Sequence, residues 1–243
     1  MLARCPIPGL FITGTDTGVG KTLVAAAIAN WFVRRGVRAA VCKPLATGCV
    51  HRREGLVSED AEFLAHHAQA KFSLNTICPQ RFAEPLAPAV AAQRAKQKIE
   101  WNAIDSAIQM MARQSDVLIV EGIGGILVPV DKQITVRDMA KWLGLPAVIV
   151  ARPGMGTINH TLLTVEALRQ ESIAVAGVVM NQYPPETPPA AEESNPRAIE
   201  RWGDVPILCL VPQFSGSAIP NLPADVVSAI DPVDWLAKAQ RAD

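Results

Sequence analysis

The chain has 243 residues, and its 23 Lys and Arg balance its 23 Asp and Glu, so the formal net charge is zero. With 49% apolar and 19% charged residues, the composition excludes a disordered chain and allows a sizeable core. A protein dedicated to nucleic-acid binding needs an excess of basic residues to neutralise phosphates, so the balanced charge argues against that class. It leaves room for a local basic site that binds a small phosphate ligand.

Cysteine usage and the lack of long apolar segments bear on the cellular compartment. No segment reaches the roughly 18 consecutive apolar residues of a membrane span, and residues 1–9 lack the apolar part of a signal peptide. The five cysteines are scattered and include no CxxC pair, which favours reduced thiols over a disulfide framework or a zinc site. We therefore expect a cytoplasmic protein that has neither a membrane nor a nucleic acid as its partner.

The first half of the chain alternates short apolar runs with helical patterns. From the amino end, the pattern predicts a strand over 10–13, a helix over 21–35, a strand over 39–43, a helix over 59–68, an irregular ordered loop over the proline-rich segment 77–88, and a helix over 99–113. Gly36 ends the first of these helices, and Pro44 closes the second strand.

The second half continues the alternation. It predicts a strand over 116–121 that runs into glycines at 122–125, a helix over 136–143, a strand over 146–151, a helix over 157–171, a strand over 173–180, a mobile proline-rich loop over 183–196, a helix over 197–202, a strand over 206–211 and a loop-rich tail. The strands are almost continuously apolar, as strands buried on both faces are. Because no linker divides the chain, we expect one doubly wound α/β domain over 1–243, with a mostly parallel sheet and helices on both faces.

The most informative segment is the glycine-rich run over 14–22, which follows a predicted strand and opens a predicted helix. That context is the one a P-loop requires, with backbone N–H groups that cradle phosphate oxygens. Lys21 would contact the β- and γ-phosphates, and the Thr22 hydroxyl would reach Mg²⁺. The strict motif has its first glycine where Thr15 stands, one residue after Gly14. A chance turn is nevertheless the weaker interpretation, because the rest of the motif is in place at Gly18, Gly20, Lys21 and Thr22.

Polar residues also follow other predicted strands, and ligands of doubly wound sheets bind beyond the carboxyl ends of the strands. Lys43, Glu121 and Asn181 are expected at that edge. Glu121 could complete a magnesium site with Thr22, because Mg²⁺ prefers hard oxygen ligands. From composition alone Asp60 is better explained as an acid at a helix start. Lys43 could stabilise a transferring phosphoryl group, or it could equally be a lysine that only extends to solvent.

Several segments, in the same order along the chain, resemble the dethiobiotin synthetase family. They are the P-loop over 14–22, Lys-Pro-Leu-Ala-Thr-Gly over 43–48, Phe-Ala-Glu-Pro over 82–85, Val-Glu-Gly-Ile-Gly-Gly over 120–125, and Thr-Ile-Asn-His over 157–160. Together with the flanking strands they span residues 10–181, about 70% of the chain. The P-loop is shared with relatives such as the cobyrinic acid amidating enzymes, whereas the segments over 43–48 and 82–85 are more specific.

The resemblance implies a P-loop NTPase fold and an ATP-dependent ligase of biotin biosynthesis. Such an enzyme would use ATP and Mg²⁺ to close the ureido ring of dethiobiotin from 7,8-diaminopelargonic acid and CO₂. A substrate amine becomes a carbamate, ATP converts it to a carbamic-phosphoric anhydride, and the second amine closes the ring, so that ADP and phosphate are released. Members of the family are homodimers, which makes a homodimer the expected state.

The resemblance also assigns roles to individual residues. Thr17 and Lys21 would act on the phosphates, and the nucleotide would be held by Gly18, Val19, Gly20, Lys21 and Thr22, with Asn181 at the adenine edge. Thr22, Asp60 and Glu121 would surround Mg²⁺, which raises Asp60 above its interpretation from composition. Lys43 and Thr47 would hold the carbamate. The substrate carboxylate would lie near the turn formed by Gly154, Met155, Gly156 and Thr157, although some members carry a lysine where Gly154 stands, so its anchor stays open.

Two alternatives fit the sequence less well. A cobyrinic-type amidating ligase needs an ammonia source, usually an appended glutaminase domain, for which we expect 243 residues to be too few. A nucleotide-switch ATPase of the chromosome- or septum-positioning type carries a second lysine early in its P-loop, where this chain has Thr15 and Asp16.

Overall fold

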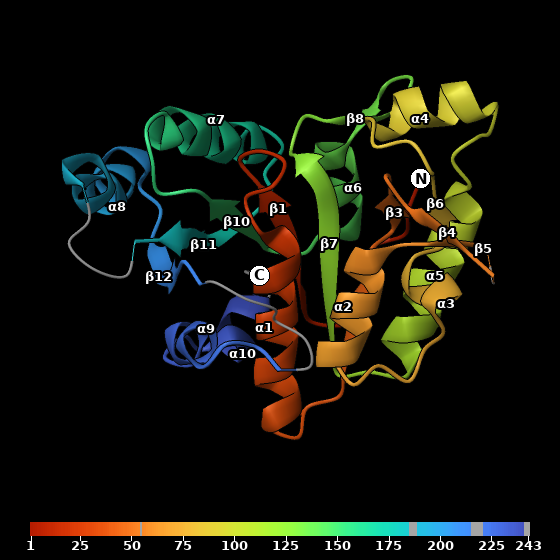
Figure 1. Cartoon of the computed structure of the whole chain (residues 1–243), viewed down its shortest axis with the longest axis horizontal. Helices are drawn as coiled ribbons and strands as arrows, with labels where there is room; N and C mark the ends of the chain where they lie inside the picture. The colour runs from red at the N-terminus through yellow and green to blue at the C-terminus, as the bar shows by residue number, and fades with distance from the viewer. Residues whose placement is uncertain (54, 185–188, 215–220, 241–243) are drawn as a thin grey trace.

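A six-stranded parallel sheet forms the centre of the computed structural model, which describes residues 1–53, 55–184, 189–214 and 221–240 (Figure 1). Its order is β12-β11-β10-β1-β7-β2, and every neighbouring pair is parallel. The strands are β1 (Gly9–Gly14), β2 (Ala39–Cys42), β7 (Val117–Gly125), β10 (Ala147–Ala151), β11 (Val175–Tyr183) and β12 (Ile207–Pro212). The predicted doubly wound parallel sheet is confirmed.

Helices cover both faces of this sheet. One face packs against α1 (Lys21–Arg34), α2 (Glu59–His67), α9 (Ala224–Ile230) and α10 (Trp235–Ala239), and the other against α5 (Trp101–Arg113), α6 (Val136–Leu143), α7 (Thr157–Arg169) and α8 (Ala190–Gly203). Successive residues of a strand point to opposite faces, so Leu10 and Ile12 join one apolar cluster while Phe11 joins the other. This arrangement explains why the strands are apolar without alternation.

Small elements beside the β2 edge of the sheet connect two of the segments that carry the resemblance (Figure 1). They include β3 (Leu45–Ala46) paired with β6 (Gln80–Arg81), the hairpin of β4 (Val50–Arg52) and β5 (Gly55–Val57), α3 (Leu74–Ile77) and α4 (Pro88–Ala95). The Phe82 N–H donates to the Ala46 carbonyl at 2.9 Å, and the Gly48 N–H donates to the Glu84 carbonyl at 3.2 Å. Segments 43–48 and 82–85 therefore support each other. The predicted loop over 77–88 is ordered, but it contains β6 and ends at the first residue of α4.

The proline-rich segment over 183–196 differs from its prediction as a mobile loop. Residues 185–188 lie outside the described residues, but α8 begins at Ala190 and contains Pro196. Proline has no N–H to donate to the carbonyl four residues earlier in a helix. Here that carbonyl belongs to Glu192, and it accepts a hydrogen bond from the Tyr183 hydroxyl at 3.1 Å. The hydroxyl thus satisfies the acceptor that Pro196 leaves free, and the helix continues.

The carboxyl-terminal segment is also more ordered than predicted, because α9 and α10 replace part of the expected loop-rich tail. Trp235 begins α10 and is fully buried against the helices and strands of one face, with its indole N–H donating to the Ile230 carbonyl at 2.9 Å. The remaining small pair, β8 (Pro129–Asp131) and β9 (Ile134–Thr135), lies before α6 on the other face. Among the described residues, no helix has the length and apolarity that crossing a membrane requires.

Replacing Trp235 with alanine is expected to lower the free energy of unfolding by about 3–5 kcal/mol, because the change leaves a large cavity. Urea denaturation followed by circular dichroism measures the effect. Trp202→Ala is the matched control, since Trp202 on α8 is 66% exposed and its removal should cost no more than about 0.5 kcal/mol. Equal losses in the two variants would contradict the packing of α10.

Candidate active site

A cavity of about 330 Å³ opens at the carboxyl edge of the sheet, where the β1–α1 loop, the end of β2, the middle of β7 and the start of α2 meet. It brings together most of the residues singled out from the sequence: Thr17, Gly18, Gly20, Lys21, Thr22, Lys43, Thr47, Asp60 and Glu121. Ile123 and Gly124 complete the lining. Glu121 lies inside β7 rather than at its end, because the strand continues through the glycines to Gly125, which pairs with Gly14 of β1.

The β1–α1 loop has the geometry of an anion cradle. Gly18 and Gly20 have φ of 77° and 89°, in the left-handed region that favours glycine. Gly20 caps α1 without any side-chain hydrogen bond, so the first N–H groups of the helix remain available to a ligand. Lys21 is buried, and its Nζ donates to the Asp16 carbonyl at 3.0 Å. Burial lowers the pKa of Lys21 although the negative charge of Glu121 opposes it.

Two carboxylates share a lysine on the opposite wall. Lys43 Nζ lies 2.6 Å from Glu121 Oε1 and 2.9 Å from Asp60 Oδ2, and the Thr22 hydroxyl donates to the same Glu121 oxygen at 2.9 Å. Burial alone would lower the pKa of Lys43, but the charges of Glu121 and Asp60 outweigh it and raise that pKa. Burial would raise the pKa of Asp60, and Lys43 outweighs it to lower that pKa. Lys43 is therefore charged, and Asp60 ionised, near neutral pH.

The oxygens of Thr22, Asp60 and Glu121 have the chemistry that magnesium requires. Glu121 Oε2 is buried and has no hydrogen-bond partner among the described residues, so it can accept a cation. Nowhere among the described residues is a group of three or more His, Cys, Asp or Glu side chains placed to hold a metal. Two carboxylates and a hydroxyl nevertheless suit Mg²⁺, which usually keeps several waters and binds substrate phosphates. The residues present therefore fit the ion.

Asn181 contacts the backbone of the phosphate loop through a hydrogen bond that the sequence did not predict. It lies inside β11 and is 2% exposed, and its Nδ2 donates to the Val19 carbonyl at 2.9 Å. Its Oδ1 has no partner among the described residues. A side chain on Gly20 would collide with the Asn181 amide. Gly20 is thus required both by its φ and by the close approach of Asn181.

Gly20→Ala is expected to weaken ATP binding by about tenfold or more, because the loop must move away from Asn181 and lose its phosphate geometry. Isothermal titration with a non-hydrolysable ATP analogue measures the loss. Gly36→Ala is the matched control: its φ is 74°, but open space surrounds it at the far end of α1. Its affinity should match that of the wild type, and a similar loss in both variants would contradict the role of the Asn181 contact.

The turn over 154–157 does not line this cavity. Gly156 caps α7 with φ of 85°, Met155 is exposed, and the buried Thr157 hydroxyl has no hydrogen-bond partner among the described residues. A neighbouring groove of about 420 Å³ lies beside the cavity. Its lining comes from the P-loop, the end of β7 with residues 126–129, and α7, and does not include the turn: Thr15, Asp16, Thr17, Gly125, Ile126, Leu127, Val128, Pro129, His160, Leu163 and Thr164. Thr17 lines both hollows.

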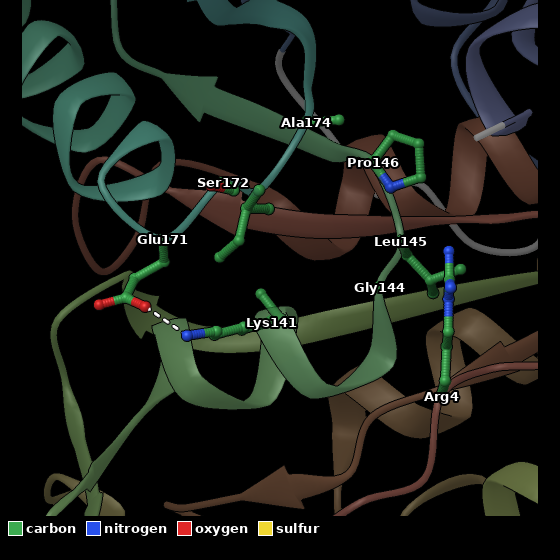
Figure 2. Close-up of a pocket in the computed structure, with 10 residues that line it drawn as sticks. Arg4, Lys141, Gly144, Leu145, Pro146, Glu171, Ser172 and Ala174 are labelled. Carbon is green, nitrogen blue, oxygen red and sulfur yellow. Dashed lines mark hydrogen bonds and ion pairs between the residues drawn. The ribbon is translucent and has the colours of Figure 1, made fainter. Parts of the chain in front are cut away.

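Another hollow lies at the opposite edge of the sheet (Figure 2). Pro146 and Ala174 line it, and these residues directly precede β10 and β11. Its charged side chains include Lys141 and Glu171, whose atoms pair at 2.7 Å. Because ligands of parallel sheets bind at the carboxyl ends of the strands, the cavity beside the P-loop is the candidate active site.

Comparisons with known proteins agree with this geometry. A family model described as an AAA domain matches residues 8–219. The ATP-dependent dethiobiotin synthetase of Thermodesulfovibrio yellowstonii is 39% identical over 214 residues, which cover 85% of this chain and 89% of that protein. The corresponding protein of Bacillus cereus is 40% identical over 209 residues, covering 86% and 84%.

A solved structure shares the fold. The septum site-determining protein MinD of Pyrococcus horikoshii, complexed with Mg-ADP, has a TM-score of 0.55 at 17% identity, over 95% of this chain and 97% of that chain. At this identity the likeness concerns the fold alone. The extent and identity of the sequence matches are decisive, and the chain belongs to the dethiobiotin synthetase family.

Proposed function

We propose that the protein catalyses the ATP-dependent carboxylation and ring closure of 7,8-diaminopelargonic acid with CO₂, which yields dethiobiotin, ADP and phosphate. The observation that carries this proposal is the single cavity in which a P-loop faces Lys43 and Thr47. A phosphate cradle and a cationic wall for a second anion are what phosphoryl transfer to a carbamate requires. Membership of the dethiobiotin synthetase family supports the same reaction.

The nucleotide end of the cavity is assigned to the P-loop. Thr17, Lys21 and the N–H groups of residues 18–20 bind the phosphates, and Thr22, Asp60 and Glu121 hold Mg²⁺. When bound, Mg²⁺ neutralises phosphate charge during transfer. Asn181 Oδ1, buried and free to accept a hydrogen bond, would take the amino group of adenine.

The second anion is assigned to Lys43 and Thr47. One amine of the substrate attacks CO₂ to form a carbamate, and a carbamate oxygen then attacks the γ-phosphorus and displaces ADP. The second amine attacks the carbonyl carbon of the anhydride, and phosphate leaves as the ring closes. The lysines stabilise the anions and the developing charge on the phosphoryl oxygens, which is the main help that phosphoryl transfer needs from a protein.

The groove beside Thr17 would hold the aliphatic tail of the substrate. Its apolar side chains include Leu127 and Leu163, and α7 begins nearby at the turn over 154–157. The free N–H groups at the start of this helix would bind the substrate carboxylate. Arg152 Nη1, 4.0 Å from Asp16 Oδ2, links the turn to the phosphate loop.

The same face would form a homodimer. Leu127, Met155 and Leu163 are large apolar side chains that lie more than half exposed around the groove and the turn. Such a cluster is typical of a surface that another protein covers. We also propose a cytoplasmic location, where ATP is available and the five cysteines, four of them buried, stay reduced.

Leu163→Glu is expected to shift the protein from dimer to monomer, because it places a charge in the proposed interface. Sedimentation velocity measures the change. Leu236→Glu, on α10 and also partly exposed, should leave the dimer unchanged. A monomeric wild type, or a dimeric Leu163→Glu variant, would contradict this interface.

The reaction is tested by ADP release coupled to a spectrophotometric assay, with dethiobiotin identified by mass spectrometry. Turnover should require ATP, Mg²⁺, 7,8-diaminopelargonic acid and bicarbonate together. Equal ADP release without the diamine would overturn the proposed function. Omitting Mg²⁺ tests the metal separately, since the protein should then lose turnover although the diamine and ATP are present.

A further inference from the structure

The two carboxylates expected to hold magnesium both contact the side chain of Lys43. Its Nζ lies 2.6 Å from Glu121 Oε1 and 2.9 Å from Asp60 Oδ2. The Thr22 hydroxyl donates to the same oxygen of Glu121 at 2.9 Å. The ammonium group of Lys43 thus contacts the two carboxylates that a bound metal ion would use.

Burial makes a cation necessary at this position. Glu121 is 1% exposed and Lys43 is 3% exposed, so each charge depends mainly on its protein partners. A buried carboxylate is stable only with an opposite charge or several donors beside it. Asp60 adds a second negative charge to the same place, and Lys43 relieves the repulsion between the two. Any cation that enters must therefore take over the role that Lys43 already performs.

Lys43 and a metal ion would lie close together on these carboxylates even if the ion took the unpartnered Glu121 Oε2. A bound Mg²⁺ lies about 2.1 Å from its oxygen ligands, and an ammonium group on the same carboxylates would be close enough for strong repulsion between two cations. We propose that Lys43 competes with Mg²⁺ for Glu121 and Asp60, and that Lys43 turns toward the carbamate only when the metal takes its place. This inference rests on the proposed function.

The competition would couple binding of the metal and nucleotide to the interaction of Lys43 with the carbamate. Lys43 and Thr47 line the same cavity, so a flexible lysine released from the carboxylates can reach the carbamate side without leaving it. The phosphates of ATP add negative charge that favours metal entry, whereas the metal alone must displace Lys43. The enzyme would thus bind the metal with its nucleotide, and Lys43 would become available to the carbamate only after both are bound.

The test measures Mn²⁺ binding without nucleotide, from the electron paramagnetic resonance signal of the free ion. Lys43→Met should bind Mn²⁺ at least on the order of tenfold more tightly than the wild type, because the competing charge is gone. Lys43→Gln provides a second neutral variant in case the first folds poorly. Intact near-ultraviolet circular dichroism is required of each variant.

Lys21→Met is the matched control, because Lys21 lines the same cavity but its Nζ contacts the Asp16 carbonyl instead of a carboxylate. Its Mn²⁺ affinity should rise clearly less than that of Lys43→Met, because the charge of Lys21 acts on Glu121 without contacting it. The competition is overturned if folded Lys43 variants bind no more tightly than the wild type, or if Lys21→Met gains as much. The wild-type protein with ADP must bind Mn²⁺ tightly. Weak Mn²⁺ binding in the presence of ADP would instead overturn the proposed magnesium-nucleotide function.

Discussion

Lys43→Met is expected to lower kcat for dethiobiotin formation by roughly 10³-fold or more, because the variant loses the positive charge that we propose to face the carbamate and the transferring phosphoryl group. Methionine keeps the length and apolar stem of lysine, so the change isolates the charge. The coupled ADP assay and mass spectrometry of the product measure the loss. A variant that keeps more than about a tenth of wild-type kcat would contradict the assignment of Lys43.

The same substitution should also affect stability, which separates it from an ordinary active-site change. Removing one partner of a buried ion pair costs about 3–5 kcal/mol, because the other charge stays buried. The raised pKa of Lys43 means that its charge contributes fully at pH values below the ordinary lysine pKa and is lost only as the pH rises through the raised value. Burial raises the pKa of Glu121, so on the acid side the pair loses its negative partner at a higher pH than an exposed glutamate would. At neutral pH the whole effect is therefore present, and urea denaturation in the presence of a chelator should show it.

A double variant provides the control for that effect. Lys43→Met with Glu121→Gln removes both charges of the closest pair, so much of the lost free energy of unfolding should return while turnover stays abolished. Failure of the double variant to recover any stability would mean that the contact of 2.6 Å between Lys43 and Glu121 has little energetic weight.

Local sequence patterns were sufficient for the main sheet and for the P-loop. The apolar runs mark β1, β2, β7, β10, β11 and β12, since strands buried on both faces must be apolar throughout. The strand–turn–helix context of Lys21 and Thr22 is local in sequence, so it could be identified without the structure. The position of Lys43 followed from Pro44, which closes the second strand, and from the rule that ligands bind beyond strand ends.

The predictions that failed depended on partners distant in sequence. Pro196 argued for a loop, and no local pattern indicates that Tyr183 would satisfy the carbonyl that the proline leaves free. The predicted strand ended at residue 121, but the glycines that follow extend β7 because Gly125 can lie directly against Gly14 of β1. For α10 the sequence does contain a local signal, since Trp235 is a large aromatic side chain, and such side chains are highly buried on average.

The candidate site was predicted as a set of residues but not as a set of contacts. Lys43 and Glu121 are 78 residues apart, and nothing in either local segment indicates that their side chains meet. The same holds for Asn181 and the P-loop, which are separated by 162 residues at the contact with Val19. Family resemblance assigned roles to these residues, whereas only the fold shows that Lys43 contacts Glu121 and Asp60, the carboxylates proposed to hold the metal.

Lys21→Met is expected to lower kcat/KM for ATP by roughly 10³-fold, because the cavity loses the cation beside the phosphate cradle. Lys21→Arg should not restore the activity, since a planar guanidinium cannot replace a compact ammonium group in a buried site. Initial rates over a range of ATP concentrations measure both variants. Far-ultraviolet circular dichroism and the free energy of unfolding confirm that α1 remains folded.

The pH dependence of the wild type gives an independent measure of Lys21. Burial lowers its pKa from the ordinary value of 10.5, so the free enzyme should lose the positive charge at a lower pH than an exposed lysine would. The kcat/KM profile reports groups of the free enzyme and should fall on its alkaline side as Lys21 loses its proton. Bound phosphates favour the charged form and raise that pKa again, so the kcat profile should fall only at higher pH. Lys21→Met should lack the alkaline fall in kcat/KM, and its persistence in that variant would show that another group causes it.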